Sequence, residues 1–295
     1  MEFLVFLAAY ILRRKCDQAG LLQGDALWRS SFANAHTVQP GKESHLLRGL
    51  LTIAIPAVLL AAGEYLLREA GWSLLVHPLG FVLLLVLMGA PGLTPMLESY
   101  TEAWRRGDMQ AAWIRVRDFL PVDERGAASS PEQMHRSLSK RLIAQIFERY
   151  FVIAFWYVIG GLAGAFVSRA LIALRDHWPH AAARPGFGRL ANALNFLPAR
   201  LLGLTFGIAG DLSGWLKQGQ SSLLNASRPN SDALLASASS ALSGYELEPE
   251  RFSQLHPDNW PDFAHSSVAA IRGLLNRSML VWICLLALLV IAGVI

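Results

Sequence analysis

Long runs of apolar residues constrain this chain most strongly. An α-helix needs about 20 mostly apolar residues to cross a hydrocarbon layer of roughly 30 Å. Such runs lie at Leu46 to Leu67, Trp72 to Ala90, Tyr150 to Leu174 and Ser278 to Ile295. Hydrophobic residues make up 53% of the chain and charged residues only 16%, whereas soluble domains carry roughly 25% charged residues. The sequence therefore predicts an all-α, polytopic membrane protein with about four transmembrane helices.

Two shorter apolar stretches leave the count of membrane passages open. The N-terminal sequence MEFLVFLAAYIL is apolar for twelve residues before a basic cluster, which suits a partial span or a helix lying at the interface. The stretch from Leu194 to Gly210 could cross the membrane, re-enter it or lie on its surface. We expect one membrane domain over residues 1–295, with polar intervals at about 91–149 and 175–277 and with amphipathic or re-entrant helices beside the spans.

Basic residues in the polar segments indicate the orientation. The interval 91–149 and the N-terminal segment are both rich in arginine, and four spans place them on the same side. Short loops rich in Lys and Arg stay in the cytoplasm. The four-span count therefore predicts a cytoplasmic position after Arg125 and a periplasmic one after Gln220, unless Leu194 to Gly210 enters the membrane.

Local patterns predict several helices in the polar intervals. Apolar residues recur with helical spacing from Glu98 until Pro121 stops the helix. Ser130 and Pro131 form a typical N-cap and first-turn pair for a short basic helix. An Ala/Ser/Leu-rich stretch predicts another helix from about Ser231 to Leu242.

The third apolar run contains small and polar residues whose spacing indicates helix packing rather than a site. Gly160, Gly164 and Ser168 recur every four residues, a spacing that lets a second helix approach closely in a bilayer. Arg169 follows them, and we expect it to extend to the membrane interface rather than to be buried. His177 and His180 flank a proline without a nearby carboxylate or cysteine cluster, so we expect no zinc site and no other metal site.

The stretch LNFLPARLLGLTFGIAGDL places charge beside glycine. On a helix, Arg200 and Asp211 share one face, and four glycines lie on the adjoining side. The two charges could line a polar crevice while the glycines contact another backbone, or the helix could lie at the surface with both charges exposed to solvent. Glycine lowers helix propensity by about 1 kcal/mol relative to alanine, so four of them on one face favour the crevice. These glycines are Gly203, Gly207, Gly210 and Gly214.

Several function classes find no support in the sequence. The formal charge of +4 is small and no long basic run occurs, so we expect no nucleic-acid partner. The phosphate-binding glycine loops, the nucleophile elbow and the paired-histidine zinc motif are all absent from the sequence. The two cysteines, Cys16 and Cys284, suggest neither a disulfide framework nor a metal cluster.

Four motifs resemble known membrane proteins. LNFLPARLLGL is similar to the Asn-x-x-Pro-Ala-Arg-Leu signature of the CobD/CbiB family of cobalamin biosynthesis, and FWYVIGGLAGAFVSRALIAL resembles the preceding segment of that family. YTEAWRRGDMQAAWIRVRD and RPNSDALLASASSALSGY resemble two further blocks in the same order. The lone C-terminal apolar run and ERYFVIAFWYVIGG are more similar to the AmpE family, inner-membrane relatives of CobD/CbiB. The resemblance covers about Tyr100 to Tyr245.

The resemblance implies two alternative functions. Similarity to AmpE implies a bacterial inner-membrane signalling modulator of β-lactamase induction and peptidoglycan recycling, whose partners are the lipid bilayer and a cell-wall recycling amidase or a muropeptide. Similarity to CobD/CbiB implies instead an ATP-dependent amide ligase, and only that alternative calls for Mg-ATP as cofactor. Whether the chain is an enzyme stays open at this point.

The resemblance also supplies candidate ligand-binding residues. The cobalamin proteins carry Glu-Asn where this chain has Glu148-Arg149, and Pro-Asn-Ala-Gly-Trp where it has Pro229 to Ala233. These departures weaken the case for the ligase reaction. A salt bridge or a helix cap explains each retained polar residue as well as a binding role does. The candidates, with Asp211 added from the helical face, are Asp108, Arg117, Asp118, Glu148, Arg200, Asp211 and Asn230.

Overall fold

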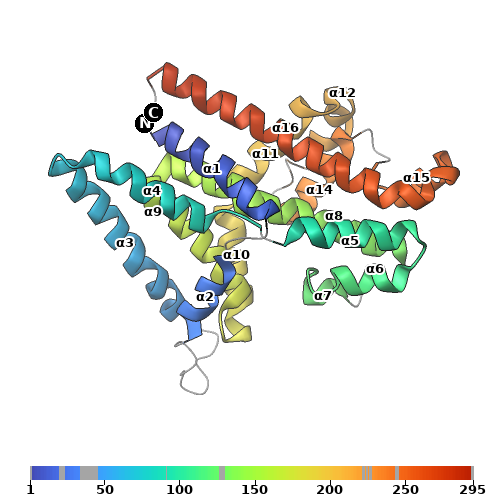
Figure 1. Cartoon of the computed structure of the whole chain (residues 1–295), viewed down its shortest axis with the longest axis horizontal. Helices are drawn as coiled ribbons and strands as arrows, with labels where there is room; N and C mark the ends of the chain where they lie inside the picture. Colours follow the sequence, from blue (N-terminus) through green and yellow to red (C-terminus); the bar gives the residue numbers. More distant parts are fainter. Residues whose placement is uncertain are drawn as a thin grey trace. The chain divides into compact units, whose positions relative to one another are not determined.

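The structure is helical throughout its described part. The computed structural model describes residues 2–19, 24–33, 46–90, 92–125, 130–220, 223, 225, 228–242 and 246–293. All regular elements in these ranges are helices, which confirms the predicted all-α class (Figure 1). The chain divides into two compact units, each assembled from separate stretches of sequence. The single domain expected over residues 1–295 stays a prediction.

Unit 1 comprises Met1–Pro91, Glu148–Pro198 and Leu286–Ile295. Within it, α1 runs beside α4 (Figure 1), and the Arg13 guanidinium donates a hydrogen bond of 3.0 Å to the Leu85 carbonyl. The helices of unit 1 are α1 (Glu2–Gln18), α2 (Gly24–Ala33), α3 (Leu47–Glu69), α4 (Ser73–Leu87), most of η2 (Phe147–Phe151), α9 (Val152–His177), η3 (Ala181–Ala183), α10 (Arg184–Leu194) and the end of α16 (Phe263–Ile291).

Unit 2 comprises Gly92–Phe147 and Ala199–Leu285. In its core the buried His135 ring links two hydroxyl groups, those of Tyr100 at 2.9 Å and of Ser267 at 2.8 Å. Its helices are α5 (Leu93–Arg105), α6 (Met109–Val116), α7 (Val122–Arg125), α8 (Pro131–Ile146), α11 (Phe196–Ala209, from Ala199 on), α12 (Leu212–Gly214), η4 (Trp215–Gly219), α14 (Asn230–Ala241), α15 (Pro249–Leu255), η5 (Pro257–Asp262) and most of α16.

Three helical stretches of the described chain are long and apolar enough to cross a membrane. They are Leu47–Glu69, Pro131–His177 and Pro257–Ile291. The second predicted span forms a shorter helix, because α4 has 15 residues and extends for about 22 Å at 1.5 Å per residue. Many apolar side chains of α3 are exposed, Val58 and Leu59 by about two thirds, as expected of a helix face that contacts lipid. The chain is thus a membrane protein.

The third predicted span is wrong as a single straight passage, because α9 turns back on itself. Glu148 and Arg175 are 27 residues apart, and a straight helix would separate them by about 40 Å. Their side chains form an ion pair of 2.5 Å. Two arms therefore run in opposite directions, and the chain leaves the hairpin at the end where it entered.

The reversal of α9 occurs at two glycines. Gly160 and Gly161 have non-helical backbone angles, and Gly161 lies at φ +59° and ψ −152°, a region open almost only to glycine. A Cβ atom on Gly164 would lie 2.5 Å from the Trp156 carbonyl oxygen of the first arm. The predicted helix-packing face of Gly160, Gly164 and Ser168 is therefore wrong as one continuous face, because Gly160 lies in the reversal. Gly164 does allow a close approach, between the two arms of the same hairpin.

The glycines of α11 and the residues after it are closely packed within unit 2. Cβ atoms on Gly203 and Gly207 would lie 2.3 Å from the Leu223 side chain and 2.7 Å from the Trp215 ring. A Cβ atom on Gly210 would lie 2.4 Å from the Ala241 carbonyl oxygen of α14. The prediction that these glycines allow close approach is confirmed, but side chains as well as backbone fill the space.

The local helix predictions mostly hold. Ser130 caps α8 by accepting a hydrogen bond of 3.3 Å from the Gln133 amide, and α14 covers the predicted Ala/Ser/Leu-rich helix. The helix predicted from Glu98 to Pro121 is wrong as one element. Gly107, at φ +75°, divides it into α5 and α6.

Candidate functional site

A half-buried carboxylate in unit 1 joins two buried arginines from the arms of the α9 hairpin. Asp25 of α2 accepts a hydrogen bond of 2.7 Å from Arg149, just before the first arm, and one of 2.6 Å from Arg169 on the second arm. The Nε2 atom of His177 lies 3.9 Å from the same carboxylate. We call these four residues the Asp25 centre.

Arg169 is the most deeply buried member of the Asp25 centre. Only 1% of its surface is exposed, and its Cζ atom lies 5.7 Å from the centroid of a Trp28 ring. The expectation that Arg169 extends to the membrane interface is therefore wrong. Its counter-charge comes from Asp25, which lies 144 residues earlier in the chain, and no local pattern reveals such a partner.

A second ion pair lies beside the centre at the open end of the hairpin. Both Glu148 oxygens accept hydrogen bonds from Arg175, at 2.5 and 2.8 Å. Arg175 also donates through Nε to Asp176 at 2.8 Å. Paired N–H groups facing paired oxygens give the strongest and most directional kind of ion pair. The Glu148–Arg175 pair therefore fixes the two arms of the hairpin against each other.

The electrostatics of the Asp25 centre keep its carboxylate ionised. Burial alone would raise the pKa of the Asp25 carboxyl, but the neighbouring His177 and the hydrogen bonds and charges of Arg149 and Arg169 hold it well below its usual range. The Nε and Nη1 atoms of Arg169 are buried and have no hydrogen-bond partner among the described residues. A guanidinium with open donors is suited to bind a carboxylate or phosphate oxygen.

The predicted site residues occupy several different places. Glu148 is in unit 1, paired with Arg175. In unit 2, the Asp108 side chain accepts a hydrogen bond from the Ala111 amide at 2.9 Å and caps α6. Arg117 and Asp118 are both largely exposed and lie 3.7 Å apart. Ligand binding by these residues stays a prediction, although a helix cap already explains Asp108 and a surface ion pair explains Arg117 and Asp118.

Among the candidates, Arg200 and Asn230 come together, as do the adjacent Arg117 and Asp118. Arg200 Nη1 donates to the Asn230 side-chain oxygen at 3.5 Å, and Nη2 donates to the Asn225 carbonyl at 3.1 Å. The predicted shared face of Arg200 and Asp211 is wrong, because α11 ends at Ala209 and Asp211 is exposed in an extended conformation. The contact joins two of the motifs that resemble the CobD/CbiB family.

Four partners in this region were not predicted from the sequence: Asp25, Arg149, Arg175 and Asp176. One signal was available, since arginines flank the Gly160-Gly161 pair at similar distances on both sides, as a hairpin with a charged open end requires. The described residues contain no group of three histidine, cysteine or acidic side chains placed to hold a metal ion.

Comparison with known proteins identifies the family. The chain matches the family described as "Regulatory signalling modulator protein AmpE" over residues 23–295. It is similar to the "Cobalamin biosynthesis protein CobD" of Chromobacterium violaceum, with 27% identity over 282 residues, 88% of this chain and 87% of that protein. The protein of the same description from Stutzerimonas stutzeri is 26% identical over 212 residues, 68% of this chain and 66% of that protein. No solved structure gives a significant match. Because the family match covers nearly the whole chain, the chain belongs to the AmpE family.

Proposed function

We propose that this protein is an inner-membrane signalling modulator that responds to an anionic ligand of cell-wall recycling and thereby influences β-lactamase induction. The family description names a regulatory signalling modulator, and the membrane-length helices support a bilayer location. The observation that carries the ligand is the Asp25 centre. Two buried arginines meet there on one carboxylate, and Arg169 retains two donors without a partner among the described residues.

A muropeptide is the favoured ligand because its peptide carries carboxylates. Guanidinium groups bind carboxylates through paired hydrogen bonds, and buried arginines do so more strongly than exposed ones. Asp25 already occupies part of this position as an internal carboxylate. A ligand carboxylate would therefore either add to the open donors of Arg169 or compete with Asp25. A cell-wall recycling amidase is the alternative partner of the same signalling role.

An amide ligase of the CobD type is the second candidate. The contact between Arg200 and Asn230 favours it, because it joins two motifs of the cobalamin proteins. The acidic candidates support it less. Both Glu148 oxygens are bonded to Arg175, and Asp108 caps a helix, so neither carboxylate is presented as a ready ligand for the magnesium that such a reaction requires.

Equilibrium binding to the purified full chain separates the two candidates. We expect calorimetry to detect binding of muropeptide fragments to the protein in the absence of magnesium. The affinity should be at least about tenfold lower in Arg169→Gln, because a charged hydrogen bond contributes about 1.5 to 3 kcal/mol. Glu102→Gln, in an exposed ion pair of α5, is the matched control. Binding of ATP only in the presence of magnesium, without binding of muropeptide, would instead favour the ligase.

We further propose that the open end of the α9 hairpin faces the cytoplasm, since arginines gather there and basic segments are retained on that side. Because the hairpin returns the chain to its starting side, reporter fusions after Arg125 and after Gln220 should both behave as cytoplasmic. This revises the periplasmic position that four straight spans imply for Gln220. A fusion after Gly71, between α3 and α4, should behave as periplasmic. A periplasmic signal after Gln220 would contradict the hairpin topology.

A further inference from the structure

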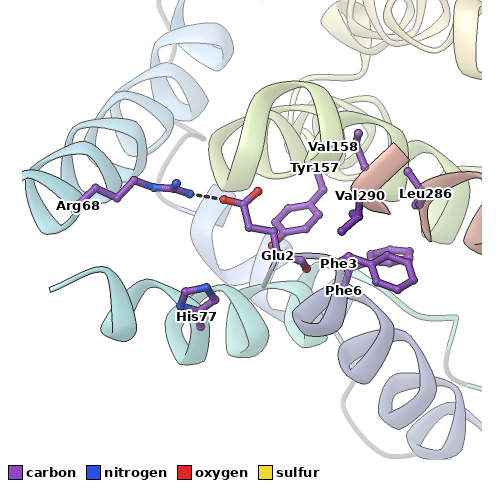
Figure 2. A pocket seen from close by; sticks show the side chains of 9 residues that line it. All are labelled: Glu2, Phe3, Phe6, Arg68, His77, Tyr157, Val158, Leu286 and Val290. Carbon is purple, nitrogen blue, oxygen red and sulfur yellow. Dashed lines mark hydrogen bonds and ion pairs between the residues drawn. The ribbon is translucent and has the colours of Figure 1, made fainter. Parts of the chain in front are cut away.

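A cavity of about 350 Å³ lies in unit 1, where the ends of several apolar helices meet. Its lining comes from the start of α1, the end of α3, the first turns of α4, the first arm of α9 and the last turns of α16. Figure 2 shows that the lining is polarised. Arg68, Glu2 and His77 lie toward one end, and Phe3, Phe6, Leu286 and Val290 gather toward the other. We call this space the tip cavity.

Two carboxylates and one guanidinium meet at the polar end of the tip cavity, where Glu2 and Arg68 line the cavity and Glu64 lines a small adjoining pocket with them. Arg68 pairs with Glu2 and, at 2.7 Å, with Glu64 on the preceding turn of α3. Both pairs use the same Nη2 atom, so Nε and Nη1 of Arg68 have no hydrogen-bond partner among the described residues. Among the described charged side chains at this end, the two carboxylates exceed the single guanidinium by one negative charge. This end therefore offers acceptors for a cationic group and donors for an anionic one.

A carboxylate at the position of Glu64 is energetically unfavourable unless it is paired or takes part in binding. It belongs to a helix long and apolar enough to cross a membrane, and 18% of its side chain is exposed. A Cβ atom on Gly161 would lie 3.3 Å from a Glu64 oxygen, so the tip of the α9 hairpin lies against this carboxylate. Ionisable groups within membrane segments are rare and commonly mark binding sites or ion pathways.

We propose that the tip cavity binds a phospholipid whose headgroup carries a primary ammonium. The ammonium binds Glu2 and Glu64, the phosphate binds the open donors of Arg68, and the start of an acyl chain lies along Phe3, Phe6 and Leu286. A volume of about 350 Å³ falls within the range of roughly 300 to 1,000 Å³ found for ligand sites. The excess negative charge disfavours binding of anionic lipids. A quaternary ammonium headgroup is also disfavoured, because it has no N–H group to donate hydrogen bonds to the carboxylates.

Lipid binding to the full chain in detergent tests this proposal by native mass spectrometry. We compare phosphatidylethanolamine, phosphatidylcholine and phosphatidylglycerol with identical acyl chains, and phosphoethanolamine as the headgroup alone. We expect phosphatidylethanolamine to bind about tenfold more tightly than the other lipids, since one charged hydrogen bond of about 1.5 kcal/mol corresponds to a factor near ten. The soluble headgroup should bind more weakly than the lipid, because it makes no contact with the apolar end.

Variants at each end of the tip cavity separate its two parts. Glu64→Gln and Glu2→Gln should each reduce the preference for phosphatidylethanolamine over phosphatidylcholine to about twofold or less. Leu286→Trp should weaken the binding of all three lipids to a similar extent, because the larger side chain fills the apolar end of the cavity. Glu102→Gln is the control. Glu64 contacts the hairpin tip, so Glu64→Gln can impair folding. In that case Glu2→Gln alone tests whether the carboxylates bind the ammonium group. Equal affinity for the three lipids, or an unchanged preference in Glu2→Gln, would overturn the proposal.

Discussion

Replacing Asp25 with alanine should lower the free energy of unfolding by about 3 to 5 kcal/mol, because it leaves buried arginine charge without its partner. Arg149 and Arg169 both bind this carboxylate, and Arg169 is almost fully buried. Chemical unfolding in detergent micelles measures the loss. The second variant, Arg169→Leu combined with Asp25→Ala, should be more stable than the sum of the two single losses predicts, because it removes one of the stranded charges.

An exposed ion pair provides the control for this prediction. Glu102 and Arg105 form a pair of 2.6 Å on α5, with both side chains about half exposed. Removing Glu102 should cost less than about 1 kcal/mol, because solvent screens such pairs. If Asp25→Ala were as stable as Glu102→Ala, the Asp25 centre would not be a desolvated ion cluster, and the ligand proposed for it would lose its basis.

Replacing Gly161 with alanine should destabilise the protein by about 1 to 3 kcal/mol, because its backbone angles lie in a region that costs any residue with a Cβ atom. The added methyl group would also meet the Glu64 carboxylate at 3.3 Å. The free energy of unfolding in detergent measures this loss. The same variant should weaken phospholipid binding in the tip cavity, since Glu64 would have to move.

The neighbouring glycine is a matched control. Gly160 has φ −121° and ψ 16°, and no atom lies within 4 Å of the position of an added Cβ. Gly160→Ala should therefore change the free energy of unfolding by less than about 1 kcal/mol, the size of an ordinary glycine-to-alanine effect. Equal losses at Gly160 and Gly161 would indicate that the chain does not reverse with this backbone geometry.

The features predicted correctly from the sequence are local ones. A serine before a proline forms a helix cap because the interacting groups lie within four residues, and Ser130 caps α8 as expected. The apolar runs likewise predict the membrane-length helices, because length and hydropathy are properties of a single segment. Close packing at Gly207 was also predictable, although the Trp215 ring that fills the space was not.

The missed features depend on contacts between distant residues. An apolar segment with small residues every four positions has the same pattern whether it crosses the membrane once or folds back at Gly160-Gly161. The partner of Arg169 is 144 residues away, so its burial could not be inferred from neighbours in the sequence. The candidate site residues were predicted mainly from motifs shared with the CobD/CbiB family. These motifs contain Arg200 and Asn230 but not Asp25.

The α9 hairpin also sets an order of events during synthesis. The first arm leaves the ribosome with Glu148 at its start, whereas its partner Arg175 follows only after the tip has been made. A lone charged group within a bilayer is unfavourable, and a matched pair is far less so. The two arms should consequently enter the membrane together as one unit.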